Sequence, residues 1–323
     1  MTDWPNHDAA WREWRTAMAG ERMHHGWLLA GKRGLGKLDF ALAAARELVV
    51  QDNSLTNNNI QPVTHPDIHI VTYSAKDDKE EKKRQNGNPY ELSKQIRERD
   101  IGHVQARLRT RPTLGERRVV IITPADDMNT HAANKLLKSL EEPPAGTFFI
   151  LVTHRPSRLL PTIRSRCRIL RLPELSDLEL EAMLLAAGQG GDLTPAIRAA
   201  QGSYGAAVRF AEMELAPIAA LIERLLLRGD ADFNARADLV RLIGPRADRE
   251  RLQAVMDLAQ AMVADHAKST GNSSQRSALI DAHAQLVALA AQAPTYNFDT
   301  GLLTLEIGSL LMRAAPASER AHG

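Results

Sequence analysis

The feature that most constrains this chain is a glycine-rich loop that stands between a strand candidate and a helix candidate. The loop, residues 31–37, reads Gly-Lys-Arg-Gly-Leu-Gly-Lys. The apolar run 26–30 precedes it, and the alanine-rich segment 38–50 follows with helical spacing. Phosphate-binding loops occur in this order of strand, loop and helix. The sequence therefore predicts an α/β domain with a phosphate loop at the start of a helix.

This loop lacks one residue that ATP chemistry requires. In the pattern G-x-x-x-x-G-K-[ST], backbone N–H groups and a lysine hold the phosphates, and a hydroxyl holds magnesium. The hydroxyl position is Leu38 here, and a leucine cannot hold a metal. The remaining candidate nucleotide-binding residues are Gly31, Gly34, Gly36 and Lys37. We expect a degenerate loop that binds ATP weakly or not at all, so that no cofactor is required.

The rest of the first half alternates strand and helix candidates. The run 118–123 is continuously apolar and β-branched, which is typical of a central strand covered on both faces. Segments 51–64 and 74–90 read as polar, solvated loops. Further strands are expected at 68–73 and 148–153, and helices at 7–19, 96–109 and 132–140. This alternation predicts a doubly wound parallel sheet.

The strand expected beside the glycine loop ends without catalytic carboxylates. A phosphate-loop ATPase normally places Asp-Glu there, to support magnesium and to activate water. The corresponding residues are Thr123 and Pro124, and neither can do this chemistry. Asp126 and Asp127 follow, but their offset places them in the turn, and we do not expect them to replace the missing pair.

Beyond Pro173 the sequence predicts helices only. Helices are expected at 177–187, 195–201 and 206–213, followed by longer ones to about residue 315. Three domains are therefore predicted, an α/β domain at 1–172, a small helical domain at 173–215 and a larger helical domain at 216–323.

Composition narrows the class of protein. Lysine and arginine total 41 against 39 aspartates and glutamates, so net charge gives no strong attraction to nucleic acid. Cys167 is the single cysteine, which excludes an internal disulfide and a cysteine-based zinc site. His65 and His69 lie at a strand entrance without thiols, and we expect them to be structural rather than metal ligands. No apolar run has membrane-spanning length, so we expect a cytoplasmic protein with no membrane partner.

Two further motifs carry a family resemblance. Residues 134–144 read NKLLKSLEEPP, and the triplet Ser165-Arg166-Cys167 follows the strand expected at 148–153. With His65-Pro66-Asp67, these motifs resemble the clamp-loader branch of the AAA+ family, over about residues 20–172 and more weakly through 202–207. The resemblance implies that the three domains are an ATPase-like domain, a helical lid and a helical collar for oligomerisation.

The resemblance also implies roles for individual residues. Arg166 would be an arginine finger that acts in trans on a neighbouring subunit's ATP site, with Ser165 and Cys167 as its motif neighbours. Active members carry a nucleotide-sensing arginine at the position of Gly205. Relatives often carry a cysteine-ligated zinc site near residues 51–59, where this chain has no cysteine, so we expect no zinc.

The implied function is that of a non-hydrolysing stator subunit in the clamp loader of DNA polymerase III, a component of the holoenzyme without ATPase activity of its own. The implied partners are the gamma or tau and delta subunits and, through the complex, the sliding clamp and primer-template DNA. Two alternatives remain open, an ATP-hydrolysing motor subunit of the same loader, and an independent DNA-binding protein that uses the basic stretch 155–171.

Overall fold

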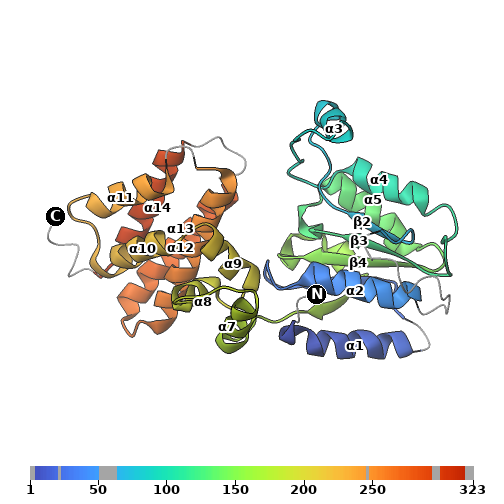
Figure 1. The fold of residues 1–323 in the computed structure, drawn as a ribbon, viewed down its shortest axis with the longest axis horizontal. Helices are drawn as coiled ribbons and strands as arrows, with labels where there is room; N and C mark the ends of the chain where they lie inside the picture. Colours follow the sequence, from blue (N-terminus) through green and yellow to red (C-terminus); the bar gives the residue numbers. More distant parts are fainter. Residues whose placement is uncertain (1–3, 21–22, 51–63, 245–246, 293–298, 317–323) are drawn as a thin grey trace. The chain divides into compact units, whose positions relative to one another are not determined.

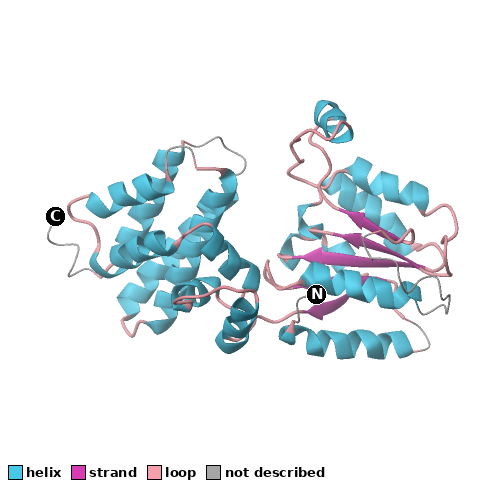
Figure 2. Cartoon of the chain, viewed as in Figure 1, coloured by secondary structure: helices cyan, strands magenta, loops and turns pink. Residues whose placement is uncertain are grey.

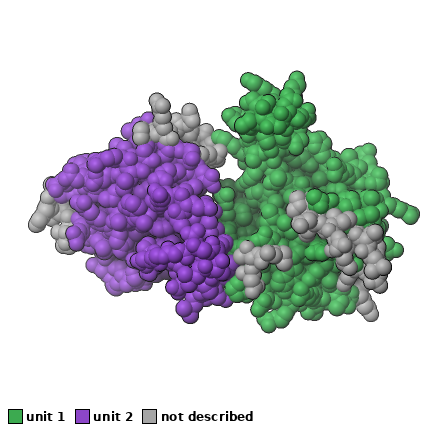
Figure 3. All heavy atoms as spheres, in the orientation of Figure 1, with its two compact units in different colours: residues 1–174 green, residues 175–323 purple. Residues whose placement is uncertain are grey.

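The computed structural model describes residues 4–20, 23–50, 64–244, 247–292 and 299–316. The chain forms two compact units, residues 1–174 and 175–323 (Figure 3). The predicted loop at 51–64 lies almost entirely outside the described residues. The division of the second unit at residue 215 stays a prediction.

The first unit is built on a parallel sheet (Figure 2). In the described residues its strands are β1 (Gly26–Ala30), β2 (Ile68–Val71), β3 (Arg118–Ile122), β4 (Thr147–Thr153) and β5 (Arg168–Arg171). Their order is β2-β3-β4-β1-β5, and every neighbouring pair is parallel. The predicted α/β sheet is confirmed. The expectation that the strand ending at Thr123 lies beside the strand of the glycine loop is wrong, because β4 lies between β3 and β1. The edge strand β5 was not predicted, because only Leu170 of its four residues is buried and a strand with this pattern gives no apolar run.

Helices cover both faces of this sheet (Figure 1). Because successive strand residues point to opposite faces, β1 sends Trp27 and Leu29 into one core and Leu28 into the other. The first core contains α1 (Asp8–Ala19) and α2 (Lys37–Val50), and the second contains α4 (Glu98–Arg107) and α5 (Thr130–Glu141).

The charged segment expected to be a solvated loop contains a helix, α3 (Asp78–Gln85). The carboxylate of Asp77 caps its first turn by accepting from the backbone N–H of Glu80 at 2.9 Å. Glu80 in turn accepts from Lys83 and from the backbone N–H of Glu91, both at 2.7 Å. Local capping and ion pairs form this helix, which has no apolar stripe for periodicity to reveal.

The second unit is entirely helical in the described residues, as predicted (Figure 2). Its helices are α7 (Asp177–Ala186), α8 (Thr194–Ala200), α9 (Tyr204–Glu212), α10 (Ala216–Arg228), α11 (Asn234–Ile243), α12 (Arg249–Ser269), α13 (Ser273–Gln292) and α14 (Thr300–Arg313). One apolar core runs through it, from Ala196 and Phe210 to Leu311 and Ala314. Among the described residues of both units, none of the helices has the length and apolar character that a membrane span needs.

Candidate functional site

The glycine loop connects the carboxyl end of β1 to the start of α2, as predicted. Gly34 and Gly36 have φ values of 82° and 69°, which residues with a Cβ rarely adopt. The backbone therefore keeps a conformation that depends on its glycines. The position without a hydroxyl, Leu38, has an exposed side chain at the start of α2.

Lys37 is turned back onto this loop. Its Nζ donates to the carbonyl oxygen of Gly31 at 2.7 Å and also to that of Lys32. The residue is only 3% exposed. Burial lowers the pKa of its ammonium from 10.5 to about 8, although the charge of Asp126 opposes this change. The lysine that would hold phosphate thus donates hydrogen bonds to carbonyl oxygens of its own loop.

The N-terminal segment covers the same loop. A Cβ placed on Gly36 would lie 2.2 Å from the indole of Trp4, so this ring rests directly on the glycine backbone. Trp4 Nε1 donates to the carboxylate of Asp39 at 3.0 Å. His7 stacks on Trp4 at a centroid distance of 5.3 Å, and its Nε2 hydrogen-bonds the carbonyl of Leu35 at 2.8 Å. No sequence motif indicated this cover.

The turn after β3 brings one acidic side chain back toward the loop. Residues Ala125–Asp127 form a 3-10 turn, as the offset predicted. The buried carboxylate of Asp126 accepts from Thr153 Oγ1 at 3.1 Å, from the backbone N–H of His154 at 2.9 Å and from Arg155 Nε at 3.3 Å. Asp126 is therefore close enough to act electrostatically on Lys37, but its oxygens already have donors.

These groups set one another's protonation. Burial alone would raise the pKa of Asp126, but the donors around it, first the backbone N–H of His154, hold that pKa below its usual value. Burial and the nearby charge of Lys37 lower the pKa of His154 to about 4. The imidazole of His154 is therefore neutral at physiological pH, and its buried Nδ1 has no hydrogen-bond partner among the described residues.

Arg166 lies near the amino end of β1, opposite to the end that leads into the glycine loop. It follows α6 (Pro161–Arg164) and precedes β5, whose Arg168 is paired with Trp27 near the start of β1. The guanidinium of Arg166 forms an ion pair with Glu141 at 2.8 Å and donates to the carbonyl of Thr162 at 3.0 Å. Since Glu141 ends α5, this ion pair joins the two motifs that carried the family resemblance.

The neighbours of Arg166 have structural environments. Ser165 Oγ donates to the carbonyl of Thr162 at 3.1 Å. Cys167 packs in the core that contains α5, and burial raises the pKa of its thiol to about 12. That thiol is protonated and serves as a small apolar group.

The other sequence candidates are placed as follows. Gly205 lies in the first turn of α9, behind the capping residue Ser203. His65 is buried, and its Nδ1 accepts from the backbone N–H of Asp67 at 3.2 Å. The part of the chain that the structure describes contains no cluster of three or more potential metal ligands. The absence of zinc stays a prediction, because residues 51–59 lie outside that part.

Comparison with known proteins gives consistent results. Residues 6–176, more than half of the chain, match the family model described as DNA polymerase III, delta subunit. The delta-prime subunit of DNA polymerase III from Pseudomonas aeruginosa is 34% identical over 173 residues, 51% of this chain and 47% of that protein. The one from Escherichia coli is 32% identical over 198 residues, 58% of this chain and 54% of that protein. The matches thus span about half the length of these curated relatives.

Related subunits and one solved structure extend the comparison. The tau/gamma subunit of DNA polymerase III from Haemophilus influenzae is 28% identical over 169 residues, 50% of this chain and 22% of that protein. A DNA polymerase III gamma subunit-related protein from Thermotoga maritima has a TM-score of 0.50 at 17% identity, over 94% of this chain and 99% of that one, which shows a likeness of fold. The family model and the delta-prime relatives agree. The chain therefore belongs to the DNA polymerase III delta-subunit family, and within that family it is similar to the delta-prime subunits.

Proposed function

We propose that this chain is a delta-prime subunit that does not hydrolyse ATP and that supplies Arg166 to the ATP site of a neighbouring subunit. Its neighbours would be gamma or tau and delta subunits, and the assembled loader would act on a sliding clamp and primer-template DNA. Residues 173–215 would serve as the lid and residues 216–323 as the collar of the complex. The family match and the delta-prime relatives support this assignment.

The observation that carries the proposal is the placement of Arg166 relative to the glycine loop. A Cβ on Gly26, the first residue of β1, would lie 2.9 Å from the carbonyl oxygen of Arg166, whereas the loop starts after Ala30, the last residue of β1. Parallel strands rise about 3.3 Å per residue, so about 13 Å of sheet separates the two. Arg166 therefore lies at the end of β1 opposite to its own loop, which supports a contact with the ATP site of another subunit over a contact with the chain's own loop.

The surroundings of Arg166 fit an exchangeable partner. Its side chain is 36% exposed and that of Glu141 is 48% exposed. Ion pairs at such exposure contribute about 0–1 kcal/mol, so replacing the carboxylate by a phosphate costs little. A guanidinium matches phosphate geometry with a fork of donors, and arginine fingers accelerate phosphoryl transfer by about 10³ to 10⁵.

Several independent features argue against hydrolysis at the chain's own loop. Leu38 offers no hydroxyl, and Thr123 and Pro124 offer no carboxylate. Lys37 is bonded to its own loop, and the indole of Trp4 covers Gly36. A motor function would need Asp126 to replace the missing carboxylates, but three donors already hold its oxygens.

The alternative of independent DNA binding through residues 155–171 has less support. Arg155 pairs with Asp126 and Asp127. Arg166 pairs with Glu141, and Arg168 pairs with Glu13 at 3.0 Å. Three of the six arginines in this stretch thus have a carboxylate partner within the chain, and the partners of Arg155 include the buried Asp126.

The test is the ATPase rate of a reconstituted loader that contains wild-type chain, Arg166→Ala or the control Arg168→Ala. Arg168 is a good control because it also forms a surface ion pair, two residues away. We expect all three loaders to assemble, Arg166→Ala to lose the turnover of one ATP site, and Arg168→Ala to match wild type. Equal rates in all three would remove the finger role, and magnesium-dependent hydrolysis by the isolated chain would remove the non-hydrolysing role.

A further inference from the structure

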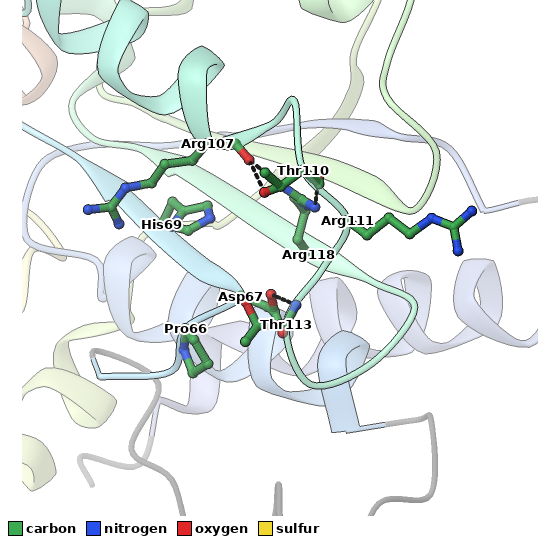
Figure 4. A pocket seen from close by; sticks show the side chains of 8 residues that line it. All are labelled: Pro66, Asp67, His69, Arg107, Thr110, Arg111, Thr113 and Arg118. Carbon is green, nitrogen blue, oxygen red and sulfur yellow. Dashed lines mark hydrogen bonds between the residues drawn. The ribbon is translucent and has the colours of Figure 1, made fainter.

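A cavity of about 310 Å³ opens at the amino ends of β2 and β3, away from the glycine loop (Figure 4). It is formed where the end of α4 and the connection to β3 pass over the start of β2. The residues that line it are Pro66, Asp67, His69, Arg107, Thr110, Arg111, Thr113 and Arg118. None of these residues has a part in the proposed function.

The floor of this cavity contains a buried cation without a counterion. Arg118 is 3% exposed, and its Nη atoms donate to the carbonyl oxygens of Arg107, at 2.8 Å, and Thr110. Among the described residues no carboxylate lies within ion-pair distance of its guanidinium. Its buried Nε–H has no acceptor within the part of the chain that the structure describes. A buried charge that is neither paired nor fully hydrogen-bonded is costly, and an anion in the cavity would offset this cost.

The single acidic residue that lines the cavity does not supply that anion. The two carboxylate oxygens of Asp67 accept the backbone N–H groups of Thr113 and Leu114, at 2.6 Å and 2.8 Å. These bonds fix the connection between α4 and β3, which is the wall of the cavity. Asp67 therefore shapes the pocket while its charge is directed to the backbone.

Further cations stand at the rim. Figure 4 shows Arg107 and Arg111 on opposite sides of the pocket, with their guanidinium groups extended outward. Both are exposed, and within the described residues neither forms an ion pair. Residues 107–118 contain five arginines and one glutamate. Burial and the charges of Arg107 and Arg118 lower the pKa of His69, so positive potential reaches into the pocket.

We propose that this pocket binds a phosphate group. Arg118 contributes its positive charge from the floor, and the side chains of Arg107 and Arg111 close over the group from either side and donate to it. Charge-assisted bonds from guanidinium to phosphate oxygens are short and strong, and paired donors match their geometry. The cavity is larger than one phosphate, so it also accommodates a phosphate that is part of a nucleic-acid backbone. Free phosphate and backbone phosphate are the two sources that the test separates.

The test follows the imidazole of His69 by NMR in the full chain at constant ionic strength. Inorganic phosphate is expected to raise the pKa of His69 by about 1, since a nearby opposite charge favours the charged imidazole. The variant Arg107→Ser/Arg111→Ser is expected to lose this response. Arg109→Ser, an exposed arginine of the same segment that does not line the pocket, is expected to keep it. Binding of phosphate at the glycine loop would affect all these proteins equally.

A second titration uses a single-stranded oligonucleotide of thymidines. If it displaces phosphate and changes the His69 signal at a lower concentration, the source is the nucleic-acid backbone; if only inorganic phosphate acts, the source is free phosphate. The proposal is overturned if phosphate leaves His69 unchanged, or if the double variant responds like wild type. Because this site is far from Arg166 in the sheet, its failure would leave the proposed function untouched.

Discussion

At the scale of single residues, the glycine loop keeps the backbone shape of a phosphate loop, while the side chain of Lys37 binds the loop itself. Lys37 satisfies carbonyls of its own loop, and Trp4 rests on Gly36. Lys37 and the backbone of Gly36 are groups that hold phosphates in loops of this pattern, so both contacts would compete with a bound nucleotide. Single substitutions can remove either contact.

Replacing Trp4 tests the cover directly. In wild type, the stack of Trp4 and His7 at 5.3 Å must be disturbed before the indole can leave Gly36. Aromatic pairs contribute about 0.5–1.5 kcal/mol. Trp4→Ala should therefore bind ATP up to about tenfold more tightly than wild type. Isothermal titration calorimetry would measure this change. Trp11→Ala is the matched control, since Trp11 packs on Phe40 instead of the loop. Unchanged affinity in Trp4→Ala would show that the indole does not limit access.

The lowered pKa of Lys37 implies that the free energy of unfolding depends on pH. Its folded-state pKa, about 8, lies below the ordinary value of 10.5. Below pH 8 the folded state carries the full cost of the buried charge; between pH 8 and 10.5 the unfolded state binds more protons, so stability rises with pH. Relative to Lys37→Met, the wild type should gain up to about 3 kcal/mol of unfolding free energy over this range. Urea denaturation at pH 7 and pH 10 measures it, and a gap between the two proteins that does not change with pH would contradict the prediction.

At the scale of elements, the strands with continuous apolar runs and the helices with apolar stripes could be predicted. The order of apolar and polar residues along these segments indicates which of their residues are buried. β3, with five buried residues, is the clearest case. β5 could not be predicted, because an edge strand with one buried residue leaves no such pattern. α3 was read as a loop because it is held by a cap and by ion pairs instead of an apolar face.

The cap of α3 gives a prediction at this scale. Asp77→Ala removes the acceptor of the N–H of Glu80, and losing such a cap typically costs about 1 kcal/mol. Hydrogen exchange over residues 78–85 should accelerate, with no effect on the sheet. Asp78→Ala is the control, because the side chain of Asp78 is 97% exposed and, among the described residues, forms only an ion pair with Arg99 at 3.7 Å. Equal protection in both variants would mean that the ion pairs alone maintain the helix.

The candidate site divides in the same way. The glycine loop and the Ser-Arg-Cys triplet are local motifs, so their residues could be named from the sequence. The contact between Trp4 and Gly36, and the return of Asp126 toward Lys37, join segments that only the folded sheet brings together. The pocket proposed to bind phosphate likewise combines the start of β2 with the end of α4, and no sequence motif includes both segments.

At the scale of the whole molecule, the two units have separate apolar cores. The second unit also contains a buried ion pair, in which Arg236 donates to Asp230 at 2.9 Å and the side chains are 9% and 2% exposed. Asp230 additionally accepts the backbone N–H groups that start α11. This pair stabilises one unit without contributing to the cores of the other.

Breaking that pair should therefore separate the stabilities of the units. Asp230→Ala leaves a buried guanidinium unpaired, which costs about 3–5 kcal/mol. Hydrogen exchange should accelerate in residues 175–323 and stay unchanged in 1–174. The control, Asp238→Ala, removes an exposed ion pair with Arg241 in the same helix and should have little effect. Equal loss of protection in both units would show that they unfold as one.

The environment of Cys167 also has a practical consequence. It is the chain's single cysteine, it is packed in the core, and its thiol pKa is about 12. Thiol reagents act on the thiolate, so the native chain is close to inert toward them at neutral pH. A cysteine introduced at an exposed position such as Leu38→Cys would then be the one reactive thiol, and a fluorescent or spin label could be attached there without first replacing Cys167.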